Sequence, residues 1–307
     1  PLEFRLRNAA REGDRRTDGV AFGRIGFEEV LRAALDHPHY RSPLPEGPCV
    51  GRGVAAGMWM NAAGTSTVQL TFNPDGTVNL IEGSTDIGGT RAAVAMVVAE
   101  ELGLEAHEVK PMVVDTDSVG YTDVTGGSRV AFSTGTAAWR AAQDAIAQLT
   151  ARAARLLEIP EDRVVFEAGT FRVKDQPDRR LHIREVIRQL DRTGGPVVAR
   201  GVSAGLRSGP GFGVHIADVR VDPETGKVEI LRYTAVQDAG RALHPTYVEG
   251  QMQGGAMQGI GWALTEEYVF DRGVLRNPTL LDYRMPTALD LPMIDTVIVE
   301  VPHTDGP

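Results

Sequence analysis

Hydrophobic and polar residues alternate in two pairs of segments, and a short turn separates the members of each pair. The pairs are residues 68–72 with 78–81 and residues 212–221 with 228–236. Pro74 and Gly76 lie in the first turn, and Pro223 and Gly226 lie in the second. Because the side chains of a strand point alternately to opposite faces, and because Pro and Gly favour tight turns, each pair predicts a β-hairpin.

Helices are predicted in five other segments from their composition and from the Pro and Gly breaks around them, and in residues 130–158 apolar residues also recur at steps of three or four. These predicted helices cover residues 26–35, 91–102, 130–158, 182–190 and 245–264. Further short strands are predicted at residues 109–114, 164–166, 170–173 and 295–301.

The order hairpin, glycine-rich segment, helix occurs twice, at residues 68–102 and 212–264. This repetition predicts an α+β fold with two similar units of mixed or antiparallel sheet and packed helices. Two such units facing one another place both glycine-rich segments near a shared cleft.

Breaks in the pattern predict three regions along the chain. Residues 1–50 are polar, with one predicted helix, and are interpreted as a connecting arm. The Thr193-Gly-Gly-Pro196 break then separates a first α+β unit, residues 51–195, from a second, residues 196–307.

Composition narrows the class of protein. The 307 residues are 42% hydrophobic and 24% charged, which is ordinary for a soluble folded chain, and no apolar run is long enough to span a membrane. A net charge of −9 argues against nucleic-acid binding. The single Cys49 excludes an internal disulfide, and together with the absence of a secretory signal it predicts a cytoplasmic protein.

The segment Asp86-Ile-Gly-Gly-Thr90 joins a predicted strand to a predicted helix. A glycine-rich backbone at a helix N-terminus presents unpaired N–H groups and the positive end of the helix dipole, and so can bind an anion such as a phosphate. The segment matches neither a Walker loop nor a dinucleotide fingerprint. A tight turn in which Thr90 caps the helix explains it equally well.

A second segment of this kind, Thr125-Gly-Gly-Ser-Arg129, also precedes a predicted helix. Its glycines allow close backbone approach, Ser128 offers a hydroxyl, and Arg129 can contact a phosphate through two parallel hydrogen bonds. The alternatives are that Ser128 caps the helix and that Arg129 pairs with Asp123 or Asp115.

A third segment, Glu249–Gly261, contains three glutamines and five glycines in a helical pattern. Each glycine in a helix costs about 1 kcal/mol relative to alanine, which close approach to a ligand or a neighbour can offset. Gln251, Gln253 and Gln258 can recognise the donors and acceptors of a polar ring system. The alternative is tight helix packing with Gly254, Gly255, Gly259 and Gly261 on one face.

Acid–base candidates are scattered. His215 is interpreted as a strand residue, His244 as a loop residue, and Asp238 as a residue that fixes a turn. We find no Ser/His/Asp or Cys/His arrangement and no set of metal ligands, so the sequence predicts neither a catalytic residue nor a metal site within this chain.

With these motifs in place, the chain resembles the molybdenum hydroxylases, the group of xanthine dehydrogenase and aldehyde oxidase, in their large molybdopterin-binding subunit. The resemblance covers nearly the whole chain in order. Its motifs are Gly83-Ser-Thr-Asp-Ile-Gly-Gly-Thr90, Ala99-Glu-Glu-Leu-Gly103, Thr125-Gly-Gly-Ser-Arg129, Val219–Val228, Gln258-Gly-Ile-Gly261 and Asp282-Tyr-Arg-Met-Pro286.

The resemblance implies a molybdopterin cofactor with molybdenum, in its cytosine dinucleotide form if the protein is bacterial. The residues implied to bind it are Asp86, Ile87, Gly88, Gly89, Thr90, Gly127, Ser128, Arg129, Val130 and Gln251. Many relatives have Gly-Gln-Gly in the first segment, whereas this chain has Ile87-Gly-Gly-Thr90, so one side-chain contact of the family is missing.

The resemblance also implies hydroxylation of a small-molecule substrate with water as the oxygen source, and electron transfer to 2Fe-2S and FAD subunits or domains. The Phe-Gly-Gly segment of the family is expected before this chain. The catalytic glutamate is expected after Pro307, so residues 196–307 form a unit truncated before it. We therefore expect the chain to require the remaining part of the molybdopterin subunit and to be inactive by itself.

Two questions stay open at the level of sequence. The substrate can be an aldehyde, an N-heterocycle, an aromatic acyl-CoA or carbon monoxide, and Met58, Trp59, Met60 and Asn61 are pocket candidates, with a core position as the alternative for Trp59. A different class of function is a non-catalytic assembly module that has the same fold and holds no cofactor.

Overall fold

Two four-stranded sheets form the framework of the computed structural model, which describes residues 1–304 and 306. The chain divides into two units: Pro1–Met60 with Gly209–His303, called here the first unit, and Asn61–Ser208, called the second unit. Each unit is described by itself.

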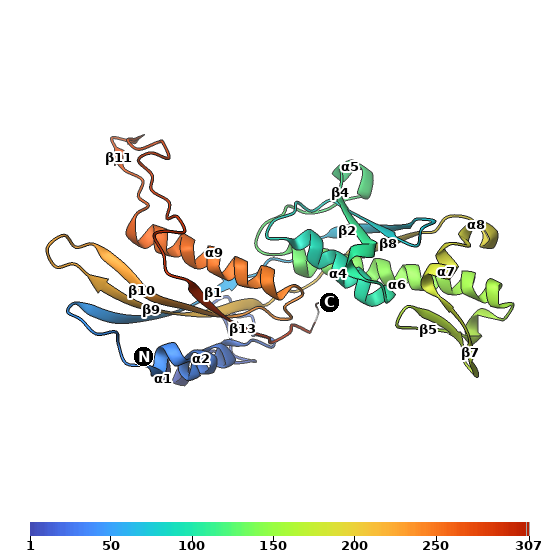
Figure 1. The fold of residues 1–307 in the computed structure, drawn as a ribbon, viewed down its shortest axis with the longest axis horizontal. Helices are drawn as coiled ribbons and strands as arrows, with labels where there is room; N and C mark the ends of the chain where they lie inside the picture. Colours follow the sequence, from blue (N-terminus) through green and yellow to red (C-terminus); the bar gives the residue numbers. More distant parts are fainter. Residues whose placement is uncertain (305, 307) are drawn as a thin grey trace. The chain divides into compact units, whose positions relative to one another are not determined.

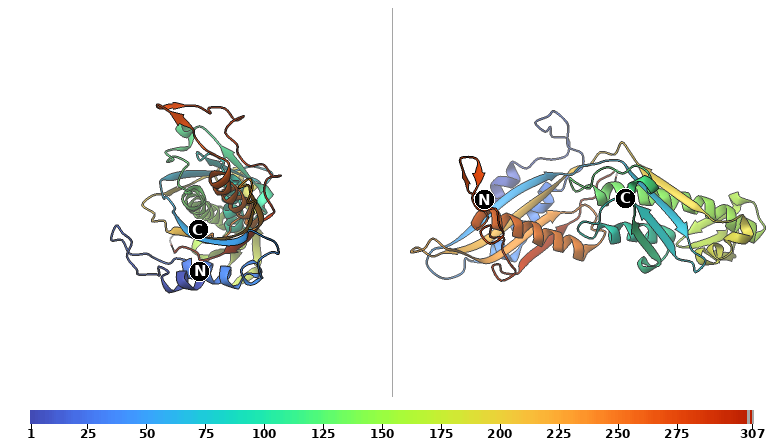
Figure 2. Two further views of the ribbon diagram at one scale, coloured as in Figure 1. Left: turned by 90° about the vertical axis from the view of Figure 1, so that its left-hand side faces the viewer. Right: turned by 90° about the horizontal axis from the view of Figure 1, so that it is seen from above.

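The first unit contains one mixed sheet between two layers of helices (Figures 1 and 2). Its elements are α1 (Leu2–Arg7), α2 (Phe27–Asp36), α3 (Pro38–Arg41), β1 (Val50–Met60), β9 (Pro210–Val221), β10 (Val228–Asp238), α9 (Pro245–Leu264), β11 (Phe270–Asp271), β12 (Val274–Leu275) and β13 (Ile294–Val299). In the order β1-β9-β10-β13, the first three strands are antiparallel and β13 is parallel to β10.

The second unit repeats this plan. Its elements are β2 (Ser66–Phe72), β3 (Val78–Glu82), α4 (Thr90–Leu102), η1 (Ala106–Glu108), β4 (Val109–Val113), α5 (Thr116–Val119), α6 (Val130–Leu157), η2 (Glu161–Arg163), β5 (Val164–Glu167), β6 (Thr170–Val173), β7 (Gln176–His182), α7 (Ile183–Ile187), α8 (Leu190–Thr193) and β8 (Val198–Ser203). In the order β8-β2-β3-β4 only the β3–β4 pair is parallel, and β5–β7 form a separate antiparallel sheet.

The repeated unit predicted from the sequence is therefore confirmed. In both units a hairpin leads into a helix, and the next strand of the same sheet lies parallel to the second strand of the hairpin, because the helix carries the chain back along the sheet. The shared cleft stays a prediction.

The core of the second unit forms where α4 and α6 cover one face of its sheet (Figure 1). Small residues on α6, such as Ala137 and Ala141, are fully buried and let the helix approach the strands closely. A Cβ atom added at Gly201 of β8 would lie 2.0 Å from the carbonyl oxygen of Ala137, so the helix backbone rests directly on this strand.

The interpretation of residues 1–50 as a connecting arm is wrong, because they form a helical layer of the first unit. Leu2 of α1 and Val30, Leu31 and Ala34 of α2 are fully buried against β9 and β10 (Figure 1). The apolar residues of α2 recur on one side of the helix, so this face is packed against the sheet.

The chain passes from one unit to the other after Met60 and after Ser208, and not at the expected boundaries 50/51 and 195/196. Residues 50–60 pair as β1 with β9 and so belong to the first unit. Residues 198–203 pair as β8 with β2 and so belong to the second. A strand takes its place from its hydrogen-bonded neighbour, and the composition around Thr193–Pro196 carries no information about that neighbour.

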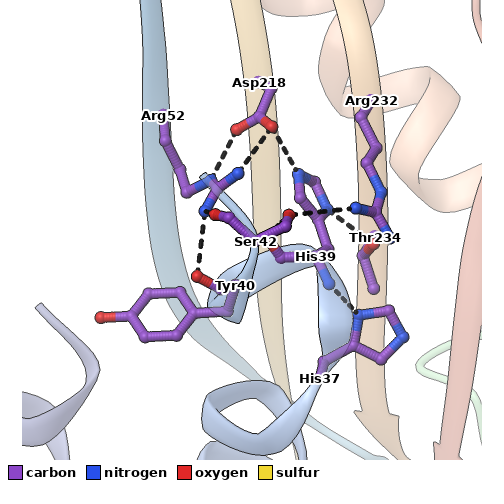
Figure 3. A network of polar contacts seen from close by, with 8 residues as sticks. All are labelled: His37, His39, Tyr40, Ser42, Arg52, Asp218, Arg232 and Thr234. Atoms are coloured by element: carbon purple, nitrogen blue, oxygen red, sulfur yellow. Dashed lines mark hydrogen bonds and ion pairs between the residues drawn. The ribbon is translucent and has the colours of Figure 1, made fainter. Parts of the chain in front are cut away.

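A buried polar network fixes the N-terminal helices to the sheet (Figure 3). The His39 side chain is fully buried, with Nε2 3.2 Å from Asp218 Oδ2 and Nδ1 2.8 Å from Thr234 Oγ1. Arg52 donates to both oxygens of Asp218, at 2.6 and 2.8 Å, and to two carbonyl groups in residues 40–42. Burial lowers the pKa of His39, so its neutral form is favoured.

Candidate functional site

Two of the three glycine-rich segments lie side by side in the second unit. Residues 83–90, called here the first loop, join β3 to α4, and residues 120–129, the second loop, precede α6. The Thr85 N–H donates to Thr125 Oγ1 at 3.1 Å, which connects the two loops directly. The N-termini of two helices therefore lie at one end of this sheet.

A buried cluster of hydroxyl groups supports the two loops from below. Thr134, in the first turns of α6, lies 2.8 Å from Ser84 of the first loop and 2.9 Å from Ser66 at the start of β2, measured between hydroxyl oxygens. Arg129 donates to the Ser66 hydroxyl at 2.9 Å. Because all four side chains are buried and hydrogen-bonded, they hold the loops to the sheet and to α6.

The start of α4 has the backbone conformation expected of an anion site. Gly88 and Gly89 have φ of 66° and 77°, in the left-handed region that favours glycine. Gly89 is the N-cap, and no side chain caps the helix from that position, so Thr90 is not the cap. Ile87 and Gly88 are exposed, whereas Gly89 and Thr90 are half-buried.

The Asp86 carboxylate binds Arg91 in the first turn of this helix. Its Oδ1 accepts from the Arg91 N–H at 3.1 Å, and its Oδ2 lies 3.3 Å from Arg91 Nε. The Asp86 side chain thus lies at the end of α4 where the helix dipole favours a negatively charged group.

At the start of α6, Gly127 and Ser128 are both left-handed, with φ of 66° and 57°. Ser128 is exposed and makes no side-chain cap to the helix, so the capping alternative does not hold. Val130 is buried in the second unit. The second loop therefore presents main chain and the Ser128 hydroxyl at the surface, beside the first loop.

Arg129 differs from the expected phosphate contact. Its side chain is 2% exposed, and its guanidinium donates to Ser66 Oγ and to the carbonyl oxygens of Val124, at 2.7 Å, and of Asp123. Burial lowers the pKa of this guanidinium, although Asp123 opposes the shift. The prediction that the Arg129 side chain contacts a phosphate through two hydrogen bonds is therefore wrong. The side chain fixes the second loop, and only the main chain of Arg129 is left to bind a ligand.

Gly127 is a sensitive position of the second loop. A Cβ atom added there would lie 2.6 Å from the Cβ of Ala62, and φ is left-handed. We expect Gly127→Ala to lower the free energy of unfolding by about 1–3 kcal/mol in urea denaturation. The neighbouring Gly126 has nothing within 4 Å of an added Cβ, so Gly126→Ala is the matched control. This substitution should change the free energy of unfolding by less than about 0.5 kcal/mol. Equal effects of the two substitutions would contradict the close approach of Gly127 to Ala62.

Glu82, which the sequence reasoning missed, is the last residue of β3, directly before the first loop. Its side chain is 1% exposed and Oε2 has no hydrogen-bond partner. Burial, and then the negative charge of Asp86, raise the pKa of Glu82 to about 7, while Arg91 opposes the shift. The signal was available: Val78, Leu80 and Glu82 occupy alternate, core-facing positions, and only Glu82 is polar.

The third segment forms α9 in the first unit, with the predicted bounds. Gln251 is exposed on it, and its convergence with the two loops stays a prediction. Tight packing explains Gly261, where an added Cβ would lie 2.0 Å from the Glu266 carboxylate, but Gly254 and Gly255 have nothing within 4 Å. Gln253 donates to the carbonyl group of Ile294 at 3.1 Å.

Other residues singled out in the sequence have ordinary structural surroundings. His215 lies in β9 with Nδ1 2.8 Å from the Tyr233 hydroxyl, and Asp238 accepts from the Gly240 N–H at 2.9 Å, as expected of a strand residue and a turn residue. His244 directly precedes α9. Trp59 is the last residue but one of β1 and has 60% of its surface exposed, so the core alternative does not hold for it.

Residues 1–304 and 306 contain neither a cluster of metal-ligating side chains nor a membrane-spanning helix. No group of three or more His, Cys, Asp or Glu side chains is placed to hold a metal ion. Within the same residues, no helix is both long and apolar enough to cross a membrane.

Comparison with known proteins assigns the family. The family model described as the molybdopterin cofactor-binding domain matches residues 40–292. The chain belongs to this molybdopterin cofactor-binding family. The putative xanthine dehydrogenase molybdenum-binding subunit of Escherichia coli is 32% identical over 98% of this chain and 43% of its own length. The nicotine 6-hydroxylase large subunit of Paenarthrobacter nicotinovorans is 30% identical over 98% and 41%.

A solved structure of another protein has the same fold. Quinoline 2-oxidoreductase from Pseudomonas putida 86 superposes with a TM-score of 0.85 at 24% identity, over 100% of this chain and 43% of that one. The chain thus spans less than half the length of each of these three proteins.

Proposed function

We propose that the paired loops of the second unit bind a molybdenum cofactor through its anionic part. The observation that carries the proposal is the Thr85–Thr125 hydrogen bond, which brings two left-handed, glycine-rich helix starts together in a chain of this family. Backbone N–H groups at helix N-termini bind phosphate and diphosphate groups, so the donor set fits the cofactor. The residues that would hold it are Ile87–Thr90 and the main chain of Gly127–Val130, with Gln251 from α9.

We further propose a dinucleotide form of the cofactor, because two adjacent helix starts offer enough donors for a diphosphate. The family resemblance implies that its base is cytosine if the protein is bacterial. When bound, the cofactor supplies the metal and accepts two electrons from the substrate. The residues of this chain bind and orient it. We propose that the proton-abstracting group is supplied from outside these 307 residues, so that this chain alone does not turn over substrate.

The proposed reaction is hydroxylation of an aldehyde or an N-heteroaromatic compound with water as the oxygen source. Relatives support this range, since their names include a nicotine 6-hydroxylase and an aldehyde oxidoreductase molybdenum-binding subunit. We also propose that the electrons pass to iron–sulfur and flavin partners in the cytoplasm.

The remaining part of a large subunit is a further proposed partner, and the first unit has an apolar surface that supports it. Large hydrophobic side chains between residues 262 and 293 are 63–97% exposed, namely Trp262, Tyr268, Phe270, Leu281, Leu289 and Met293. Exposed apolar surface of this extent is typical of a contact with another protein segment.

Metal analysis of the gently purified complex tests the cofactor proposal. We expect about one molybdenum atom per copy of this chain, and release of a pterin nucleotide on acid treatment. A folded complex without metal or pterin would instead support the non-catalytic assembly module.

A further inference from the structure

Glu82 occupies an unusual place for a carboxyl group. It shares the core-facing side of β3 with Val78 and Leu80, which belong to the apolar core beneath α4 and α6. It is also the residue next to Gly83, where the first loop begins. Its Oε2 atom is buried and has no hydrogen-bond partner. Buried polar atoms are nearly always paired, so an unpaired carboxyl oxygen at the base of a ligand loop needs a functional explanation.

Among the residues that the structure describes, no unengaged cation lies beside this carboxyl group to neutralise it. The strands on either side place Val68 and Val113 opposite Glu82. Of the charged groups that affect it, Asp86 of the first loop repels its negative form, and Arg91 of α4 attracts it but is already paired with Asp86.

Two further charged groups at this end of the second unit are engaged elsewhere. Asp115 accepts from the Asp117 N–H after β4, and Arg129 donates to Ser66 and to two carbonyl groups. The described surroundings of Glu82 therefore favour its neutral form.

We propose that Glu82 carries a proton when an anionic group is bound at the paired loops, so that anion binding and protonation of Glu82 are coupled. The inference rests on the proposed cofactor site and adds a residue and a proton to it. Glu82 acts as a positioning residue: its neutral form leaves the base of the first loop without a negative charge.

Electrostatics gives the direction of the coupling. A buried carboxylate and a bound anion repel each other strongly, because the interior of a protein screens charge poorly. Binding of the anion therefore favours the protonated form, and by reciprocity protonation favours the anion. The proton comes from solvent and goes to a carboxyl oxygen of Glu82, and no other bond changes. A pKa of about 7 supports the coupling, since both forms are then populated near neutral pH.

Inorganic sulfate is a suitable probe, because its charge stays at −2 over the whole range from pH 6 to 9. We expect the sulfate affinity of the 307-residue chain to fall above pH 7, approaching about tenfold per pH unit if only the protonated form binds. Glu82→Gln keeps the size of the side chain and stays neutral, so the affinity of this variant for sulfate should not change with pH. Glu161→Gln, at an exposed position, is the matched control and should retain the fall.

A second measurement uses the unsubstituted chain and so does not depend on how the variant folds. Carbon-13 NMR of the Glu82 carboxyl group should show a higher apparent pKa with saturating sulfate than without it. The inference is overturned if sulfate does not bind, if its affinity is independent of pH, or if Glu82→Gln retains the pH dependence. Molybdenum analysis of the complex decides the cofactor proposal separately.

Discussion

Replacing Gly89 by valine is expected to lower the molybdenum content of the purified complex by about tenfold or more. Gly89 is the N-cap of α4 with φ of 77°, a conformation that a β-branched residue adopts only at a cost of about 1–3 kcal/mol. The first loop can relieve this strain only by moving the N–H groups at the start of α4 away from the geometry that binds the cofactor. Metal analysis by mass spectrometry, normalised to protein, measures the effect.

Gly226→Val provides the matched control. Gly226 has φ of 72° in the turn between β9 and β10, and nothing lies within 4 Å of an added Cβ, so the backbone strain is similar but lies in the first unit. We expect this variant to keep its molybdenum. Loss of metal from both variants would show that the effect is one of folding, and full retention in Gly89→Val would contradict the cofactor role of the first loop.

Elements set by local signals could be predicted well from the sequence. The bounds of α9 agree with the prediction, because Pro245 and the helical pattern up to Leu264 define both ends. Strand β1 was not recognised: residues 50–60 contain three glycines and no clear alternation, and their strand conformation comes from pairing with β9.

The role of Arg129 could not be derived from its position in a glycine-rich motif. The sequence left two alternatives, a phosphate contact and an ion pair with Asp123 or Asp115. The structure shows a third arrangement, in which the guanidinium binds Ser66, 63 residues away, and two carbonyl groups. Such partners are set by how β2 and α6 pack, which no local pattern encodes.

The candidate site shows the same limit. Both glycine-rich loops were identified from the sequence, because left-handed glycines before a helix are a local signal. Their adjacency depends on a hydrogen bond between Thr85 and Thr125, 40 residues apart. Glu82 is visible in the sequence as a single polar residue within an apolar alternation. It was missed because its lack of a hydrogen-bond partner is visible only in three dimensions.

Removing the carboxyl group of Asp218 is expected to have the largest effect on stability. Asp218 binds Arg52 through both oxygens and lies 3.2 Å from His39, and all three side chains are largely buried (Figure 3). Hydrogen bonding from Arg52 and the charges of its neighbours lower the pKa of Asp218 although burial, the largest single influence, would raise it. Asp218→Ala leaves Arg52 without a counter-ion and should lower the free energy of unfolding by about 3–5 kcal/mol.

Urea denaturation followed by circular dichroism measures this change, and two further variants interpret it. Arg220 lies on the same strand and forms an exposed ion pair with Glu229 at 3.3 Å, so Arg220→Ala should cost less than about 1 kcal/mol. The double variant Arg52→Met/Asp218→Leu removes both charges and should regain part of the loss, because the penalty comes from the unpaired charge. If Asp218→Ala cost no more than Arg220→Ala, the buried network would not be what fixes residues 37–42 to the sheet.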